Sequence, residues 1–192
     1  MTRYFIILPL LCLAGITAQA QDFRRFKMAL GIPFAPVTSD QFDYYGGFYL
    51  EPAVRLKDDL SLGIYLAIME SDDDSNDNPD INSSETAAFF STAFVLDKYT
   101  SLGRPKTFYG LMLGTVFHSF ETIERPFLTN NGVLGGEILY EDRTGVLIAP
   151  RIGATFGPLQ MTMMYQFMTN ELPGLLTMQA GVEIGGGRKN KK

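Results

Sequence analysis

The sequence predicts an all-β protein, an eight-stranded antiparallel up-and-down β-barrel that spans a membrane. Three observations predict this fold: segments in which residue character alternates with period two, the chemistry of the two faces of those segments, and the lengths of the connections between them. The composition agrees, because 19 glycines, 15 phenylalanines and 9 tyrosines supply turn formers and strand-forming aromatic residues. After residue 20, no run reaches the ~18 consecutive apolar residues of a membrane helix.

The chain divides into three predicted parts. Residues 1–20 are expected to be a signal peptide, with Arg3, the apolar run "FIILPLLCLAGI" and a small-residue cleavage site ending at Ala20. The barrel domain is expected over 21–186 and a basic periplasmic tail over 187–192. Cleavage would remove Cys12, the one cysteine, and with it any disulfide or thiolate site. A formal net charge of −5 gives no sign of a nucleic-acid partner.

Eight segments alternate with the period of a strand. They are 23–31, 42–56, 60–70, 86–98, 107–120, 144–156, 159–169 and 175–185. Alternate side chains of a strand point to opposite sides of the sheet, and in each segment one side is apolar and carries no charge. An even number of strands is what a closed antiparallel barrel prefers.

The opposite sides mix small, polar and charged residues, which suits the narrow filled interior of a membrane barrel better than a solvated exterior. Opposite charges are expected to pair across this interior, because an unpaired buried charge is costly. The predicted lumen charge network contains four positive and four negative residues: Arg25, Lys27, Arg55, Arg151, Asp43, Glu51, Asp97 and Glu183.

The connections alternate in length. Those after the second, fourth and sixth segments are short, at 57–59, 101–106 and 157–158, whereas those after the first, third and fifth are long, at 32–41, 71–85 and 121–143. Short periplasmic turns and long external loops alternate in this way in outer-membrane barrels. The parity predicts that both termini lie on the periplasmic side.

With its signal sequence, eight strands, loop parity and face chemistry, the mature chain resembles the small outer-membrane β-barrel proteins. This class includes the outer membrane protein A-type and X-type barrels and many barrels of Bacteroidota-like bacteria. The resemblance is one of architecture, without a diagnostic motif. It implies a location in the cell outer membrane, a lipid bilayer as the surroundings and a narrow lumen filled by polar side chains.

The segment "GVLIAPRIGATFG" (145–157) places a proline and an arginine side by side in an apolar strand. If Pro150 faces lipid, Arg151 faces the lumen, where Glu51 and Glu183 are its expected partners. A closed barrel has no edge strand in which the missing N–H of a proline would be harmless. We therefore expect a β-bulge at Pro150 and another at Pro52.

One long loop, "SDDDSNDNPDINSSE" (71–85), has oxygen ligands at the spacing of a calcium-binding loop. The candidate metal ligands are Asp74, Asn76, Asn78, Asp80, Asn82 and Glu85. Pro79 occupies the position at which such loops have glycine, and strands rather than helices flank the loop. Weak Ca²⁺ binding and a solvated loop without metal both fit this pattern; no other cofactor is expected.

A second feature is "FHSFETIE", which contains His118 and Ser119. Some outer-membrane barrels hydrolyse or transfer lipid acyl chains with serine and histidine, so a lipid-modifying enzyme is one hypothesis. Adjacent residues of a strand point to opposite faces, however, so these two side chains could meet only across a bulge. No catalytic residue is assigned.

The third feature is the segment 121–143, in which Asn131-Gly132 is a strong hairpin-turn signal. The fifth and sixth strands could continue through it as a protruding ribbon, or it could be a plain external loop. A ribbon would expose an edge able to bind a protein partner. The candidate interaction residues at its tip are Phe127, Leu128, Asn130, Asn131 and Gly132.

These observations favour an outer-membrane barrel with a structural or interaction role and an external or periplasmic protein partner. An eight-stranded barrel is too narrow for a wide diffusion pore, although a small conductance would be compatible. The alternative is a secreted or periplasmic soluble lipocalin-like barrel, which would turn its apolar face inward to bind an apolar ligand.

Overall fold

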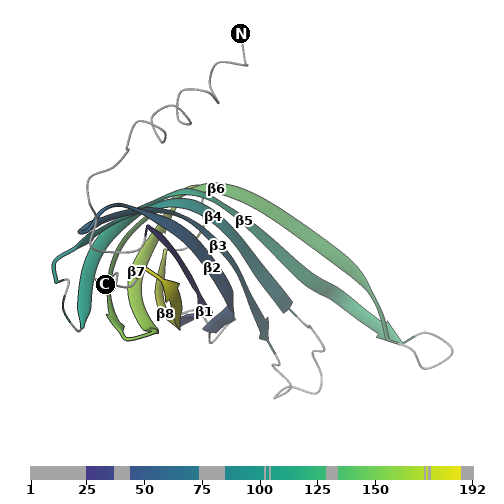
Figure 1. Cartoon of the computed structure of the whole chain (residues 1–192). Coiled ribbons are helices and arrows are strands. Elements are labelled where there is room, and N and C mark those ends of the chain that lie inside the picture. Colours follow the sequence, from purple (N-terminus) through teal and green to yellow (C-terminus); the bar gives the residue numbers. More distant parts are fainter. Residues whose placement is uncertain are drawn as a thin grey trace, which may run out of the picture.

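The protein is a closed barrel of eight antiparallel strands, each paired with its neighbours in the chain and the last with the first (Figure 1). The strands are β1 (Phe26–Pro36), β2 (Tyr44–Lys57), β3 (Leu60–Asp73), β4 (Glu85–Tyr99), β5 (Lys106–Leu128), β6 (Leu134–Phe156), β7 (Leu159–Met168) and β8 (Leu175–Gly185). This confirms the predicted all-β, up-and-down topology. We call the end with the short connections the turn end and the opposite one the loop end.

This computed structural model describes residues 25–36, 44–73, 85–101, 103, 105–128, 134–170, 172 and 174–186. For 72–73, 85–86, 120–128 and 134–140 it describes the backbone alone. Within these ranges, no helix is long and apolar enough to cross a membrane.

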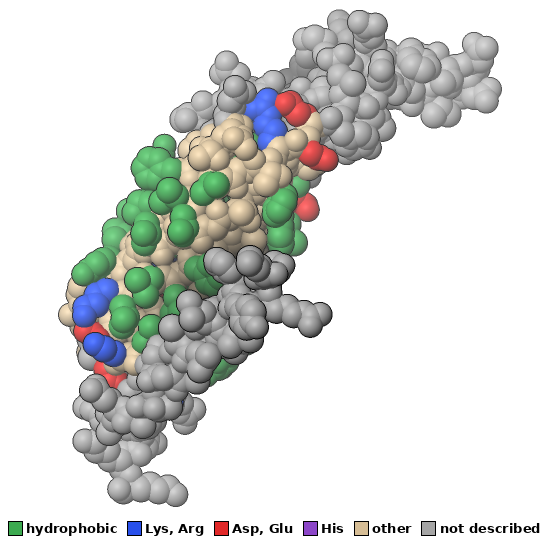
Figure 2. Space-filling view, turned by 90° about the horizontal axis from the view of Figure 1, so that it is seen from above, with side chains coloured by type: hydrophobic (Ala, Val, Ile, Leu, Met, Phe, Trp, Pro, Cys, Tyr) green, Lys and Arg blue, Asp and Glu red, His purple; other side chains and the backbone are tan. Residues whose placement is uncertain are grey.

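The outside of the barrel is apolar, and large hydrophobic side chains are exposed on all eight strands. In Figure 2 they spread over the middle of the visible face, while charged side chains gather towards its ends. Aromatic residues mark both borders of this band, as in the girdles of membrane barrels. Those towards the loop end include three ring pairs, Phe34–Tyr44, Phe90–Phe117 and Tyr165–Phe167; those at the turn end include Phe26, Tyr109 and Phe156.

Within the barrel wall, charged side chains point into the interior. Five of them, Lys27, Glu51, Arg55, Asp97 and Arg151, are each 1–2% exposed. A soluble lipocalin-like barrel has the opposite arrangement, with an apolar interior and a charged exterior. The distribution is therefore that of a transmembrane β-barrel.

The two prolines leave the barrel register intact. Towards β5, pairing is continuous through Leu111↔Pro150; towards β7, it is interrupted at Ala149–Pro150 and resumes with the same offset. Pro52 behaves likewise, with the interruption on the side of β3. Each strand residue directs its N–H and C=O to one neighbour only, so proline removes a hydrogen bond on one side. The bulges predicted at Pro150 and Pro52 are therefore wrong.

The fifth and sixth strands are much longer than the other six, at 23 residues each. They pair from Lys106↔Thr155 to Leu128↔Leu134, and Figure 1 shows them projecting beyond the rest of the barrel. The register shifts by one residue between Glu124 and Phe127. Segment 121–143 is thus a paired ribbon along most of its length, and not a plain loop.

Because the exterior is apolar, we expect a charged residue placed on it to lower the free energy of unfolding by an amount that depends on its depth in the membrane. Leu113 lies on the outward face of the barrel-wall part of β5, between Phe94 of β4 and Ile148 of β6, and is 55% exposed, whereas Phe156 ends β6 at the turn end. We expect Leu113→Arg to lower the free energy of unfolding in lipid vesicles by about 2–4 kcal/mol and Phe156→Arg by about 0–1 kcal/mol.

Urea titration of the refolded protein in vesicles measures both values, and Leu113→Ala and Phe156→Ala control for the lost side chains. Equal costs for the two arginines would contradict the assignment of the exterior to lipid.

Candidate functional site

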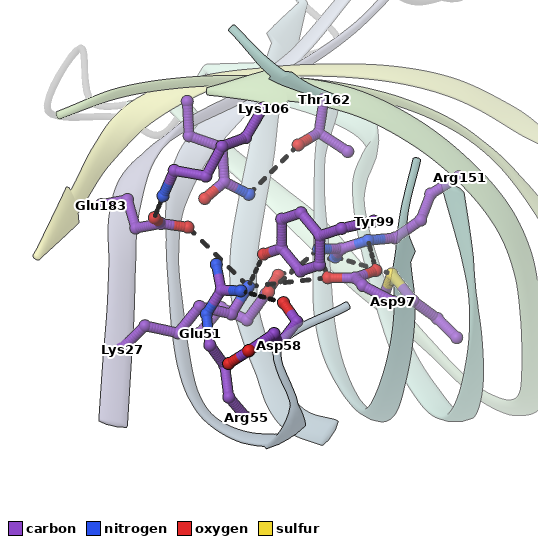
Figure 3. A network of polar contacts seen from close by, with 12 residues as sticks. Lys27, Glu51, Arg55, Asp58, Asp97, Tyr99, Lys106, Arg151, Thr162 and Glu183 are labelled. Carbon is purple, nitrogen blue, oxygen red and sulfur yellow. Dashed lines mark hydrogen bonds and ion pairs between the residues drawn. The ribbon is translucent and has the colours of Figure 1, made fainter. Parts of the chain in front are cut away.

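Arg151 is the centre of the lumen. Its Nη1 and Nη2 donate to the two carboxylate oxygens of Glu51 at 2.6 and 2.9 Å, and its Nε and Nη2 donate to those of Asp97, both at 3.0 Å. The three side chains come from β6, β2 and β4, so the group connects three sides of the barrel (Figure 3). A planar guanidinium suits this role because it can bind two carboxylates in bidentate geometry at once.

Glycine makes room for this group. A Cβ at Gly110 would collide with the Asp97 carboxylate, and one at Gly153 would collide with the ring of Phe108. That ring lies beside Arg151, with its centroid 5.4 Å from the guanidinium carbon. Packing around Arg151 thus explains why glycine occupies these two inward-facing positions.

A second layer of charges lies closer to the turn end, around Tyr99. Lys27 donates to the Tyr99 hydroxyl at 2.8 Å and lies 3.7 and 3.8 Å from carboxylate oxygens of Asp97 and Glu183. Lys106 donates to Glu183 at 2.9 Å. The Arg55 guanidinium lies over the Tyr99 ring at 4.4 Å. A cation over an aromatic face gains from the ring quadrupole.

Six of the eight residues predicted for the lumen network lie together in these two layers: Lys27, Glu51, Arg55, Asp97, Arg151 and Glu183. Asp97 takes the place expected for Glu183 beside Arg151, and Glu183 pairs with Lys27 and Lys106 instead. Arg25 lies outside the network, because it precedes β1 and its side chain is exposed. Asp43 lies outside the described residues.

Sequence reasoning missed Tyr99 and Lys106. Both lie at strand ends beside the short connection 101–106, and the predicted segments stopped one residue short of each. Continuing the alternation by one residue would have placed Tyr99 on the same face as Asp97.

The half of the lumen towards the loop end is mainly apolar, which corrects the expectation of a lumen filled by polar side chains throughout. Its buried polar residues include Ser71, Gln166 and Thr177. Tyr45 and Phe89 pack edge to face with their ring centroids 4.8 Å apart, and Val116 is fully buried beside them. Leu172, from the β7–β8 connection, is buried in the same cluster. The charged layers are thus covered on the loop-end side by close-packed apolar side chains.

His118 and Ser119 are not brought together. His118 is half-buried, with its ring centroid 4.2 Å from that of Phe89, while Ser119 is exposed and its Oγ lies 2.7 Å from an Asp142 carboxylate oxygen. The two side chains lie on opposite faces of β5, so the arrangement lacks a nucleophile in contact with a base. The candidate calcium ligands 74–82 lie outside the described residues, Glu85 is described by its backbone alone, and Ca²⁺ binding stays a prediction.

The two edges of the ribbon are covered to different extents, and in the described part of the chain β5 beyond Thr122 and a longer part of β6 have no second neighbouring strand. On one side β4 pairs with β5 as far as Glu85↔Thr122, and on the other β7 pairs with β6 only as far as Leu147↔Met168. The β7–β8 connection covers the next two positions: Thr169 N donates to Val146 O at 3.1 Å, and the Asn170 amide donates to Thr144 O. Among the described residues, β6 from Leu134 to Arg143 pairs with β5 alone.

Comparison with solved structures identifies the architecture. The crystal structure of Ail, the attachment invasion locus protein of Yersinia pestis, in complex with the heparin analogue sucrose octasulfate, matches with a TM-score of 0.53 and 14% sequence identity over 84% of this chain and 99% of that one. Ail in a phospholipid bilayer nanodisc matches with a TM-score of 0.50 and 15% identity over the same shares. The fold is that of the small eight-stranded outer-membrane β-barrels.

The likeness extends to the outer membrane protein OprG from Pseudomonas aeruginosa, with a TM-score of 0.49 and 9% identity over 88% of this chain and 100% of that one. No family model matches the sequence, and no curated protein matches it significantly. At these identities the comparisons establish the fold and no more.

The Arg151 group predicts a large effect on stability. Arg151→Leu leaves two buried carboxylates without their main cation, so we expect the free energy of unfolding to fall by about 3–5 kcal/mol and the thermal unfolding temperature to drop. Thermal and urea unfolding of the refolded protein in detergent measure this.

The matched control is Lys98→Leu, which breaks an exposed pair at the turn end. There, a hydrogen bond from Lys98 lowers the pKa of the Asp59 carboxyl, but water screens both partners, so little change is expected. The triple variant Arg151→Leu, Glu51→Leu, Asp97→Leu should recover stability relative to Arg151→Leu. Unchanged stability of Arg151→Leu would contradict the assigned role.

Proposed function

We propose that this protein resides in the outer membrane and acts as an attachment or interaction protein, with the barrel as a closed scaffold and the β5–β6 ribbon as its external contact element. The ribbon carries the proposal. The hydrophobic band needs strands only about as long as β7 and β8, which have 10 and 11 residues, yet β5 and β6 have 23. Anchoring in a bilayer does not require the additional length.

The packing of the barrel interior favours a closed scaffold and disfavours an ion channel. The two charged layers have their principal groups paired with one another, and apolar side chains pack across the loop-end half. Ions would have to separate buried pairs and also pass an apolar layer, and both steps are costly.

The structural similarity to Ail supports a role in attachment. Ail is named an attachment protein, and one of its structures holds a heparin analogue. An exposed strand edge binds extended segments through main-chain hydrogen bonds, which is a general mode of protein recognition. Attachment through the ribbon is therefore the role we propose for this chain.

Location can be tested by extraction. We expect the protein in the outer-membrane fraction, released by detergent and not by osmotic shock or high salt. The folded barrel should also run faster than the heat-unfolded chain on a denaturing gel. Recovery in the periplasmic wash would contradict the proposed location.

The role of the ribbon can be tested by shortening it. A variant in which residues 123–138 are replaced by Asn-Gly keeps the Thr122↔Leu139 pair and the whole barrel. Cells displaying the wild type should attach to surfaces coated with matrix or serum proteins better than cells displaying the shortened form at equal surface levels. Equal attachment would contradict the proposed function. Lys98→Leu, which changes only an exposed pair at the turn end, is the control.

A further inference from the structure

Among the described residues, the open edge of β6 has a defined set of backbone groups that no neighbouring strand pairs with. Val146 directs its N–H and C=O away from β5, because its N–H donates to Thr169 Oγ1 at 2.9 Å and its C=O accepts from Thr169 N. Backbone direction alternates along a strand. The even-numbered residues Gly136, Ile138, Tyr140 and Asp142 therefore also direct these groups away from β5.

The position of Pro150 provides an independent check on this alternation. It is also even-numbered, and the interruption that it causes lies on the side of β7 and not of β5. The same parity therefore holds along β6 from the barrel wall to the ribbon. An incoming strand would meet alternate N–H and C=O groups in register with the sheet.

The charge of the loop end determines which strand would pair there. The ribbon between residues 118 and 144 contains five acidic residues and two basic ones, for a net charge of −3; they are Glu121, Glu124, Glu137, Glu141, Asp142, Arg125 and Arg143. Arg143 already pairs with Glu141 at 2.6 Å.

Two of these acidic residues face each other in the register. Glu124 of β5 is directly opposite Glu137 of β6, next to the register shift. Like charges directly opposite each other in a sheet are destabilising, and a nearby cation relieves their repulsion. The ribbon would thus gain from a basic partner and lose from an acidic one.

The same charge disfavours a second copy of the chain on this edge, because two ribbons side by side would bring together two charges of −3. We propose that the β6 edge from Gly136 to Asp142 binds an extended, basic segment of a partner protein by strand addition. This rests on the proposed function and specifies its partner. The expected partner chemistry is opposite to that of the anionic heparin analogue held by Ail.

The test uses synthetic peptides of roughly ten residues, about the length of a long strand, on the full-length protein refolded in detergent. One peptide alternates lysine and valine, and its matched control alternates glutamate and valine. We expect binding of the lysine peptide to weaken with added salt, as screening predicts, and the glutamate peptide to bind at least tenfold more weakly.

Two variants at one position separate the backbone from the side chain. Tyr140→Pro removes an N–H that points to the open edge and leaves pairing with β5 intact, whereas Tyr140→Thr removes the same side chain and keeps the N–H. We expect Tyr140→Pro to weaken binding about fivefold relative to Tyr140→Thr, as expected for the loss of one hydrogen bond. Unchanged gel mobility of the folded form verifies that both variants fold.

The charge contribution is tested by Glu124→Gln with Glu137→Gln, which should weaken lysine-peptide binding and reduce its salt dependence. Equal affinities of the two Tyr140 variants, equal affinities of the two peptides, or cross-linked dimers that form through the edge and are lost in Tyr140→Pro would each overturn the inference. These outcomes are independent of the shortened-ribbon experiment. Loss of attachment there without lysine-peptide binding here would leave the proposed function standing and remove the basic partner.

Discussion

Backbone hydrogen bonding is the constraint on which the rest of this structure depends. In hydrocarbon a backbone N–H or C=O without a partner is very costly, so the sheet has to close on itself. Closure with eight strands leaves an interior just wide enough for side chains. Alternation then forces every second residue of each strand inward, and lipid takes the other half. The apolar exterior, the buried charges and the inward-facing glycines all follow from this geometry.

The interior uses two different solutions to the same packing problem. Near the turn end, Arg151 holds Glu51 and Asp97, and each buried charge has an opposite charge or an aromatic ring close by. Near the loop end, aromatic and aliphatic side chains fill most of the space, and Gln166 donates to Thr177 as a buried polar pair among them. The charged groups near the turn end connect strands that are not neighbours through hydrogen bonds and ion pairs, and the apolar cluster near the loop end excludes water. Together they fill the interior of the barrel with side chains, as the closed scaffold that we propose for the ribbon would need.

The sequence was informative where period-two alternation was strong, so the strands, their order and the inward direction of Arg151 could be predicted. It was less informative about depth, because alternation assigns a residue to a face and not to a height. Asp97 therefore pairs with Arg151 where Glu183 was expected, and the apolar layer around Phe89 was not anticipated. The bulge prediction failed for another reason. A proline in a closed barrel loses a hydrogen bond to only one neighbouring strand, and its strand keeps the register with both neighbours. The ribbon stood as one of two alternatives because its weak alternation resembles that of a loop.

The ribbon also shows where the closure constraint ends. Within the hydrocarbon band β6 is paired on both sides, and its open edge begins only where the β7–β8 connection stops covering it, at Thr144. Beyond the membrane, water can satisfy the open N–H and C=O groups, so an edge that lipid forbids becomes tolerable there. An edge of this kind would also pair with any exposed strand, including that of another copy, unless something discriminates among partners. The excess of acidic residues in the ribbon sequence supplies that discrimination, because it penalises self-association and acidic segments and leaves basic ones favoured.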